Sequence, residues 1–146
     1  MGKHLPTNVL TSYLVLVRDE KVLLARRSNT GYRDGQYSLP AGHVEPGESF
    51  TAALLREVDE EIGVHIALEG LAVPHILHRK GEDGSERVDA FFLVSRWEGE
   101  VQNREPEKCD DLSWFPMDRL PENTIPYIRT VLENIRRGIF YSEYGW

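Results

Sequence analysis

The chain has 146 residues, of which 40% are hydrophobic, and its 17 Lys and Arg against 24 Asp and Glu give a formal net charge of −7. This length predicts a single domain over residues 1–146, large enough to bury about two-thirds of its unfolded surface. The negative charge argues against a broad nucleic-acid-binding surface, but it does not exclude a small nucleotide, which needs only a local metal ion and one or two arginines.

Nothing in the composition points to secretion or to a membrane. The one cysteine, Cys109, has no partner for an internal disulfide. The apolar run near the start is only about nine residues long, which is too short for a membrane span, and it lacks the order of regions found in a signal peptide. These features predict a cytoplasmic protein that does not enter a membrane.

The first predicted elements are two strands in a hairpin. Residues 9–17 alternate as a strand, residues 18–21 supply the turn, and residues 22–26 return as the partner strand. Apolar residues on both faces of the second strand indicate that both faces are covered. Arg26 and Arg27 end this strand, and two interpretations stay open: one of them faces an anionic ligand, or both belong to a solvated strand end.

A loop and a short strand lead into the first helix. Residues 29–36 are rich in turn formers, and residues 37–39 can form a short strand. Residues 50–62 are compatible with a helix throughout, with Ser49 as its N-cap and Gly63 where a C-terminal cap belongs.

This helix is predicted to have two different faces. At 3.6 residues per turn, an apolar stripe gathers on one side, formed by Leu54, Leu55, Val58 and Ile62. Glu57, Glu60 and Glu61 share a second arc together with the small Ala53. The carboxylates repel one another at neutral pH, and a hard cation such as Mg²⁺ would remove that cost. A solvated acidic face is the alternative that these residues alone leave open.

Two more strands are predicted after the helix. Residues 71–78 and residues 88–97 are joined across a turn at residues 81–84. His75 and His78 are three apart on a strand and therefore point to opposite faces, which makes them a poor pair of metal ligands. Both are interpreted as structural.

The chain ends with a polar loop, a short strand and a second helix. Residues 99–111 form the loop, residues 112–115 the strand, and residues 126–137 a helix that ends at Gly138. Strands on both sides of a central helix, with another helix at the end, predict an α/β fold in which helices cover a mixed sheet. The aromatic tail, residues 140–146, packs either on the body or on a second subunit, so both a monomer and a homodimer are open.

The segment around the first helix carries a family motif. Its defining positions are Gly42, Glu48, Arg56, Glu57, Val58, Glu60, Glu61, Gly63 and Val64. This spacing matches the Nudix box at every specified position, and the chain resembles the Nudix hydrolases. The resemblance implies an α/β/α sandwich with a mixed β-sheet and hydrolysis of a nucleoside diphosphate linked to another group.

The resemblance also implies roles for the residues of the box. Glu57, Glu60 and Glu61 correspond to ligands of Mg²⁺, for which Mn²⁺ is a possible substitute, and the Gly42 carbonyl is a further ligand. Arg56 would hold a box carboxylate in position, and Glu48 would accept hydrogen bonds from behind the metal ligands or be an occasional ligand itself. The expected catalytic group is Glu57, Arg56, Glu60 and Glu105, with Glu57 as the first choice for the general base and Glu105 as the second.

Outside the box the chain is similar to the MutT-like nucleoside-triphosphate pyrophosphohydrolases. The likeness places Glu105 as a further acidic metal ligand, unless it is merely a solvated loop residue. Arg26 lies where that branch has a nucleotide-contacting arginine. Asn123 and Thr124 lie beside the position of a base-reading asparagine, although Thr124 is also a good N-cap for the last helix.

The expected activity is magnesium-dependent conversion of a nucleoside triphosphate to a monophosphate and pyrophosphate, with an oxidised purine such as 8-oxo-dGTP as one candidate. The alternative substrates are a nucleotide sugar, ADP-ribose, a dinucleoside polyphosphate and a capped RNA end. A non-catalytic nucleotide-binding module is a third interpretation, although none of the box carboxylates is missing.

Overall fold

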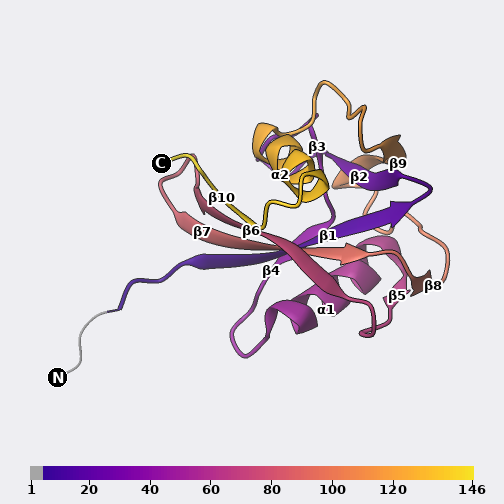
Figure 1. The fold of residues 1–146 in the computed structure, drawn as a ribbon, viewed down its shortest axis with the longest axis horizontal. Helices are drawn as coiled ribbons and strands as arrows, with labels where there is room; N and C mark the ends of the chain where they lie inside the picture. The colour runs from indigo at the N-terminus through magenta and orange to yellow at the C-terminus, as the bar shows by residue number, and fades with distance from the viewer. Residues whose placement is uncertain (1–4) are drawn as a thin grey trace.

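The structure, a computed structural model, describes residues 5–146 and is built from ten strands and two helices (Figure 1). In chain order these elements are β1 (Val9–Arg18), β2 (Lys21–Arg27), β3 (Tyr37–Ser38), β4 (Ala41–His43), α1 (Phe50–Ile62), β5 (His65–Ile66), β6 (Ala72–Lys80), β7 (Glu86–Val94), β8 (Trp97–Glu98), β9 (Cys109–Pro116), α2 (Pro126–Arg136) and β10 (Tyr141–Tyr144). No helix within these residues is long and apolar enough to cross a membrane.

The main sheet is mixed, as predicted. Its strands follow the order β10-β6-β7-β1-β2-β3, with β4 also paired to β1 and β9 to β2. The β1–β7 and β10–β6 pairs are parallel, whereas the other pairs of this sheet are antiparallel. The short strands β5 and β8 form a separate pair.

The two helices cover opposite faces of this sheet, because β1 is apolar on both sides. Tyr13 and Val15 of β1 lie in the core cluster that includes α2. Leu14 and Leu16 lie in the cluster that includes α1. Figure 1 shows α1 and α2 on opposite sides of β1. The predicted α/β/α arrangement is confirmed.

Helix α1 begins and ends where its sequence predicts. The Ser49 hydroxyl accepts a hydrogen bond from the Ala52 amide at 3.0 Å, and Gly63 adopts the left-handed conformation with φ 71°. The buried residues of the helix are Ala53, Leu54, Val58 and Ile62. The prediction that Leu55 belongs to the core stripe is wrong, since this residue at the edge of the stripe is only partly buried.

Two strands differ from their predicted lengths. The strand predicted over residues 88–97 ends at Val94, and the chain then forms β8, which pairs with β5. The strand predicted over residues 112–115 begins earlier, at Cys109, because the whole segment pairs with β2. The β1–β2 hairpin is as predicted, and its turn residues Asp19 and Glu20 have φ of 53° and 64°, as a tight hairpin turn requires.

The start of α2 corrects one expectation. The N-cap position is Ile125, which makes no side-chain capping bond. Thr124 is instead buried, and its hydroxyl donates to the Pro121 carbonyl at 2.7 Å. The prediction that Thr124 caps this helix is therefore wrong, and Pro126 begins the helix without a capping side chain.

The aromatic tail packs on the body of the protein. Residues 141–144 form β10, which runs parallel to β6. His75 is fully buried, and its two ring nitrogens lie 2.8 Å from the Ile139 carbonyl and 2.7 Å from the Ser142 hydroxyl. The structural interpretation of His75 is confirmed, because its ring ties β6 to the tail.

Candidate active site

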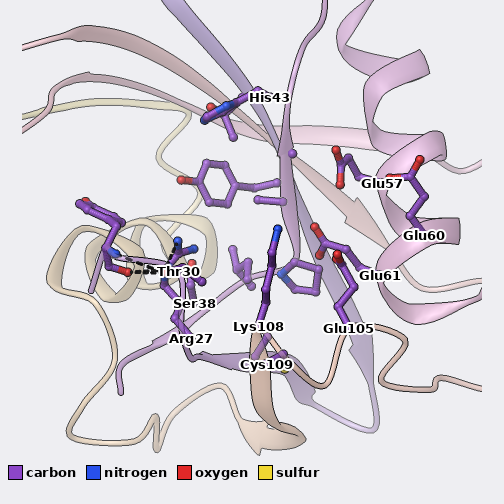
Figure 2. Close-up of a pocket in the computed structure, with 18 of the residues that line it drawn as sticks. Arg27, Thr30, Ser38, His43, Glu57, Glu60, Glu61, Glu105, Lys108 and Cys109 are labelled. Carbon is purple, nitrogen blue, oxygen red and sulfur yellow. Dashed lines mark hydrogen bonds between the residues drawn. The ribbon is translucent and has the colours of Figure 1, made fainter. Parts of the chain in front are cut away.

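A cleft of about 1320 Å³ opens between the acidic face of α1 and the loops at the end of β2. Several predicted site residues line it, namely Arg26, Gly42, Arg56, Glu57, Glu60, Glu61 and Glu105. Figure 2 shows Glu57, Glu60, Glu61 and Glu105 gathered on one side, with His43, Thr30 and Arg27 across from them. Segments that are far apart in the sequence therefore meet here.

The contact between α1 and β4 requires a glycine. A Cβ atom added at Gly42 would overlap the side chain of Glu57, which packs directly on this residue. The helix is tied to the sheet near the same place, since the Ser12 hydroxyl donates to the Phe50 carbonyl at 2.7 Å. Gly42 therefore lets the acidic face of α1 approach the sheet closely.

Arg56 holds two carboxylates at once. Its Nε and Nη2 donate to the two oxygens of Glu48 at 2.8 and 2.9 Å, and its Nη1 donates to Glu57 at 2.7 Å. The Arg56 guanidinium, helped by the Glu45 amide, lowers the pKa of Glu48 to about 2. Arg56 thus holds a box carboxylate as predicted, and Glu48 is its anchor rather than a residue of the cleft wall.

Glu61 is a partly buried carboxyl of the cluster. Burial, followed by the charges of Glu57 and Glu105, raises its pKa well above the usual value. Burial also raises the pKa of Glu105, while nearby Lys108 opposes that shift. Like charges that are partly removed from water are costly to keep together.

Glu105 reaches this place because its loop is fastened to the end of α1. The Gln102 amide donates to the Ile62 carbonyl, and the Arg104 amide donates to the Glu61 carbonyl, both at 3.0 Å. The Arg104 side chain lies where a Cβ atom on Gly63 would be. The loop after β8 is therefore held across the C-terminal end of α1, with Glu105 beside Glu61.

The donors fit a hard divalent cation by their chemistry. Carboxylate oxygens and a backbone carbonyl are the ligands that Mg²⁺ prefers. As the side chains stand, however, no three acidic, histidine or cysteine side chains in the described part of the chain converge closely enough to hold a metal ion. The fit thus rests on the kind of oxygen that Glu57, Glu61 and Glu105 bring to one side of the cleft.

The opposite wall carries two arginines that are already engaged by the protein. Arg26 donates to Asp110 at 2.7 Å, and 37% of its side chain is exposed. Arg27 donates to the Tyr32 carbonyl at 2.7 Å and to the Thr30 hydroxyl at 3.1 Å, which shapes the loop after β2. Both arginines line the cleft.

Two predicted substrate contacts lie elsewhere. Asn123 and Thr124 are not among the residues that line the cleft. The Asn123 side-chain amide donates to the Gly35 carbonyl at 2.8 Å, and the Asn123 carbonyl accepts from the Tyr37 amide at 2.9 Å. Asn123 thus joins the loop before α2 to the loop after β2.

The structure adds cleft residues that the sequence did not single out. Lys108 lies close to Glu105, and Figure 2 shows its amino group directed into the cleft. Thr11, Tyr13, Arg79 and Tyr127 line the cleft on the side of α2. The sequence does contain a weak indication that Arg79 is buried. It stands two residues after Leu77 and four after His75 on one strand, so the three side chains share the same face.

Comparison with known proteins gives a consistent result. The NUDIX domain family model matches residues 9–135. The NAD-capped RNA hydrolase NudC of Stutzerimonas stutzeri (strain A1501) is 34% identical over 125 residues, which are 82% of this chain and 40% of that protein. A human 8-oxo-dGDP phosphatase is 33% identical over 108 residues, which are 73% of this chain and 31% of that protein.

Solved structures resemble the fold over nearly the whole chain. The crystal structure of a MutT NUDIX hydrolase from Burkholderia pseudomallei superimposes with a TM-score of 0.80 and 26% identity, covering 88% of this chain and 98% of that one. By contrast, the chain spans only 40% and 45% of the length of two of the NudC relatives.

Proposed function

The chain belongs to the Nudix hydrolase family, and we propose that it is a magnesium-dependent pyrophosphohydrolase that cleaves a nucleoside triphosphate to a monophosphate and pyrophosphate. One observation carries the proposal. The cleft has a wall of four carboxylates, Glu57, Glu60, Glu61 and Glu105, facing basic side chains across a space large enough for a nucleotide. The similarity to a MutT NUDIX hydrolase over 98% of that chain supports the same choice.

The acidic wall would hold the metal ion. Glu57, Glu60, Glu61 and Glu105 supply carboxylate oxygens, with the Gly42 carbonyl as a further ligand, and Mn²⁺ has the same ligand preference. When bound, such an ion neutralises phosphate charge and acidifies the attacking water.

The side chains around the wall orient the reacting groups. Arg56 fixes Glu57 through a charge-assisted bond at 2.7 Å, so that this carboxylate keeps its direction. Glu57 and Glu105 are the two groups proposed to accept the proton of the attacking water. Lys108 and Arg26 present positive charge to the polyphosphate from inside the cleft and from its opposite wall.

The position of attack tests this proposal. Hydrolysis of a deoxynucleoside triphosphate in ¹⁸O water is expected to place the label in pyrophosphate and none in the monophosphate, because attack occurs at the second phosphorus. Mass spectrometry of the two products measures this. Label in the monophosphate indicates attack at the first phosphorus, and orthophosphate with a diphosphate product indicates attack at the third. Either result contradicts the proposal.

A second candidate function has its own support. NudC relatives are named for NAD-capped RNA, and their identity to this chain is 34% over 125 residues. A dinucleotide contains the same pyrophosphate linkage, so the same acidic wall would serve. Release of nicotinamide mononucleotide from NAD or from NAD-capped RNA, without turnover of any triphosphate, would favour this candidate over the first.

A further inference from the structure

The aromatic tail, residues 140–146, lies along the edge of the main sheet. Its strand β10 pairs with β6 at that edge (Figure 1). Gly145 and Trp146 follow β10 and contact the last residues of β6, on either side of Arg79. Arg79 lines the cleft. The tail therefore packs against a strand that supplies a residue of the cleft.

The tail holds the backbone before and after Arg79. Trp146 Nε1 donates to the His78 carbonyl at 3.0 Å, and the centres of the Trp146 and His78 rings lie 4.7 Å apart. Gly145 packs so closely on Lys80 that an added Cβ atom would overlap the Lys80 carbonyl. Both sequence neighbours of Arg79 are thus fixed by the tail.

A second cleft residue, Tyr127 of α2, also contacts the tail. The centre of the Tyr144 ring lies 5.8 Å from that of Tyr127. The Tyr127 ring in turn packs against the guanidinium of Arg79, whose carbon is 4.2 Å from the ring centre. Tyr144 and Arg79 are register partners in the β10–β6 pair, so their side chains point to the same face of the sheet. The three side chains therefore form one contiguous cluster.

This cluster extends to the loop after β2. The Tyr127 hydroxyl lies 3.3 Å from the Tyr32 hydroxyl, and both residues line the cleft. The carboxylates of the acidic wall come instead from α1 and from the loop after β8. The tail thus packs against the side of the cleft that does not supply the proposed metal ligands.

The contacts of the tail are specific although much of its surface is exposed. Tyr144 and Trp146 remain 37% and 58% exposed. Between them, Gly145 has φ of 88°, a conformation that favours glycine. Because these residues bury little area, their loss should affect the geometry of the cleft more than the stability of the fold.

We propose that the aromatic tail positions the substrate-binding side of the cleft, with Gly145 and Tyr144 holding Arg79 and Tyr127 in the geometry that binds a nucleotide. A side chain that is already held in its bound geometry loses less conformational freedom when the ligand binds. Tyr144 is therefore a positioning residue that acts through Tyr127. The inference rests on the proposed function only in taking the cleft as the nucleotide site.

Gly145→Ala tests the proposal without removing any side chain. We expect it to raise KM for dGTP, or for NAD under the second candidate function, by about fivefold and to keep kcat within about twofold. Gly70→Ala is the matched control. Gly70 has the same φ of 88°, but an added Cβ atom there has nothing within 4 Å. It shares the backbone strain without the contact and should keep the wild-type KM.

Tyr144 provides an independent set of variants. Tyr144→Ala should raise KM by about as much as Gly145→Ala, whereas Tyr144→Phe keeps the ring and should retain the wild-type KM. Tyr141→Ala is the control on the same strand. Tyr141 lies three residues before Tyr144, so it points to the opposite face of the sheet, and its hydroxyl donates to Glu143 at 2.8 Å.

Calorimetric Kd values give a readout that does not depend on turnover. The probes are α,β-methylene-dGTP and a methylene-bridged analogue of NAD, each with Mg²⁺. We expect Gly145→Ala and Tyr144→Ala to weaken binding of at least one probe by about fivefold. Melting temperatures of all the variants show whether an effect on binding only follows from loss of stability.

Weaker binding in Gly145→Ala and Tyr144→Ala, with wild-type values for Tyr144→Phe, Gly70→Ala and Tyr141→Ala, supports the inference. Unchanged KM and Kd, an equal change in Gly70→Ala, or a fall in kcat at unchanged KM overturns it. A lower melting temperature with unchanged Kd also overturns it, because the tail then only stabilises the fold. If wild type binds neither probe, the inference fails as well.

The same measurements separate this inference from the proposed function. Probe binding that depends on Gly145 and Tyr144, without hydrolysis of any nucleotide, would support the inference and reject the proposed activity. Hydrolysis of a triphosphate whose KM is the same in wild type and in every tail variant would support the proposed activity and reject the inference.

Discussion

The two sides of the cleft handle charge in opposite ways. On the acidic wall, Glu60 keeps 57% of its side chain exposed, and burial and neighbouring carboxylates raise the pKa of Glu61. On the side of the cleft that α2 covers, the cleft residue Arg79 is 5% exposed and forms an ion pair at 2.9 Å with Asp89, which is 0% exposed and does not line the cleft. One wall gathers like charges near water, and the other buries opposite charges together.

The two arrangements have different consequences. The excess of negative charge on the acidic wall favours binding of a cation, whereas the Arg79–Asp89 pair stabilises the fold. The carboxylates of the acidic wall repel each other, so their closeness costs stability unless a cation joins them. The Arg79–Asp89 pair is compensated internally, and removing one member leaves an uncompensated buried charge. Removing a carboxylate of the acidic wall should therefore lower activity, whereas removing one member of the Arg79–Asp89 pair should lower stability.

The largest effect is expected for the buried pair. Asp89→Ala should lower the free energy of unfolding by about 3 to 5 kcal/mol, because Arg79 is left buried without its counter-ion. Urea unfolding followed by circular dichroism measures the change. Asp59→Ala is the control, since Asp59 forms only a long surface ion pair, 3.9 Å from Arg104 with both side chains about half exposed, and it should change stability by less than about 0.5 kcal/mol. Equal small changes would contradict a structural role for the pair.

The acidic wall should respond in turnover rather than in stability. Glu57→Gln or Glu61→Gln is expected to lower kcat at least about a hundredfold, equivalent to about 2.7 kcal/mol, because each removes ligand charge from the metal site. Circular dichroism should stay unchanged. Asp59→Asn, on the same helix and outside the cleft lining, is the control and should keep normal turnover. Near-normal turnover of the Glu57 or Glu61 variant would rule out this metal site.

A smaller effect is expected where the loop completes the wall. Glu105→Gln should slow turnover or weaken Mg²⁺ binding by about tenfold or more, which corresponds to about 1.4 kcal/mol. Glu107→Gln should have little effect, since Glu107 is exposed and does not line the cleft. Titration of activity against Mg²⁺ compares the two variants. Equal, small shifts would return Glu105 to the role of a solvated loop residue.

The smallest effect is expected for the pH-dependent hydrogen bond between Tyr37 and Asp111. The Tyr37 hydroxyl donates to Asp111 and lowers the pKa of that carboxyl from its usual 3.8. This bond therefore stabilises the fold above pH 3.8 and is lost as the pH falls through the lower pKa of folded Asp111. Tyr37→Phe should cost about 1 kcal/mol at pH 7 and progressively less below pH 3.8.

Urea unfolding of wild type and Tyr37→Phe at pH 7 and pH 3 measures this dependence. Tyr141→Phe is the control, because Tyr141 donates to Glu143 at 2.8 Å on the exposed tail, where such a bond contributes little. A cost for Tyr37→Phe that is the same at both pH values would show that the hydroxyl does not act through ionised Asp111.

Local patterns in the sequence were sufficient for the helix that carries the box. Ser49 and Gly63 cap it as predicted, and the arc shared by Glu57, Glu60 and Glu61 follows from 3.6 residues per turn. The hairpin of β1 and β2 was predictable for the same reason, since its turn and register involve neighbouring residues. These features depend on contacts within a few residues, which a single segment determines.

Only the tertiary structure decided which distant segments meet. Glu105 joins the acidic wall because the Arg104 amide bonds to the Glu61 carbonyl, 43 residues earlier in the chain. Thr124 was expected to cap α2, yet the packing of its loop turns its hydroxyl to Pro121. The Arg79–Asp89 pair depends on the register of β6 and β7. The buried Thr11 hydroxyl, which has no hydrogen-bond partner, lies beside Asp89 because of the register of β1 and β7. Such contacts depend on how the whole sheet assembles, and no local pattern of residue types specifies that register.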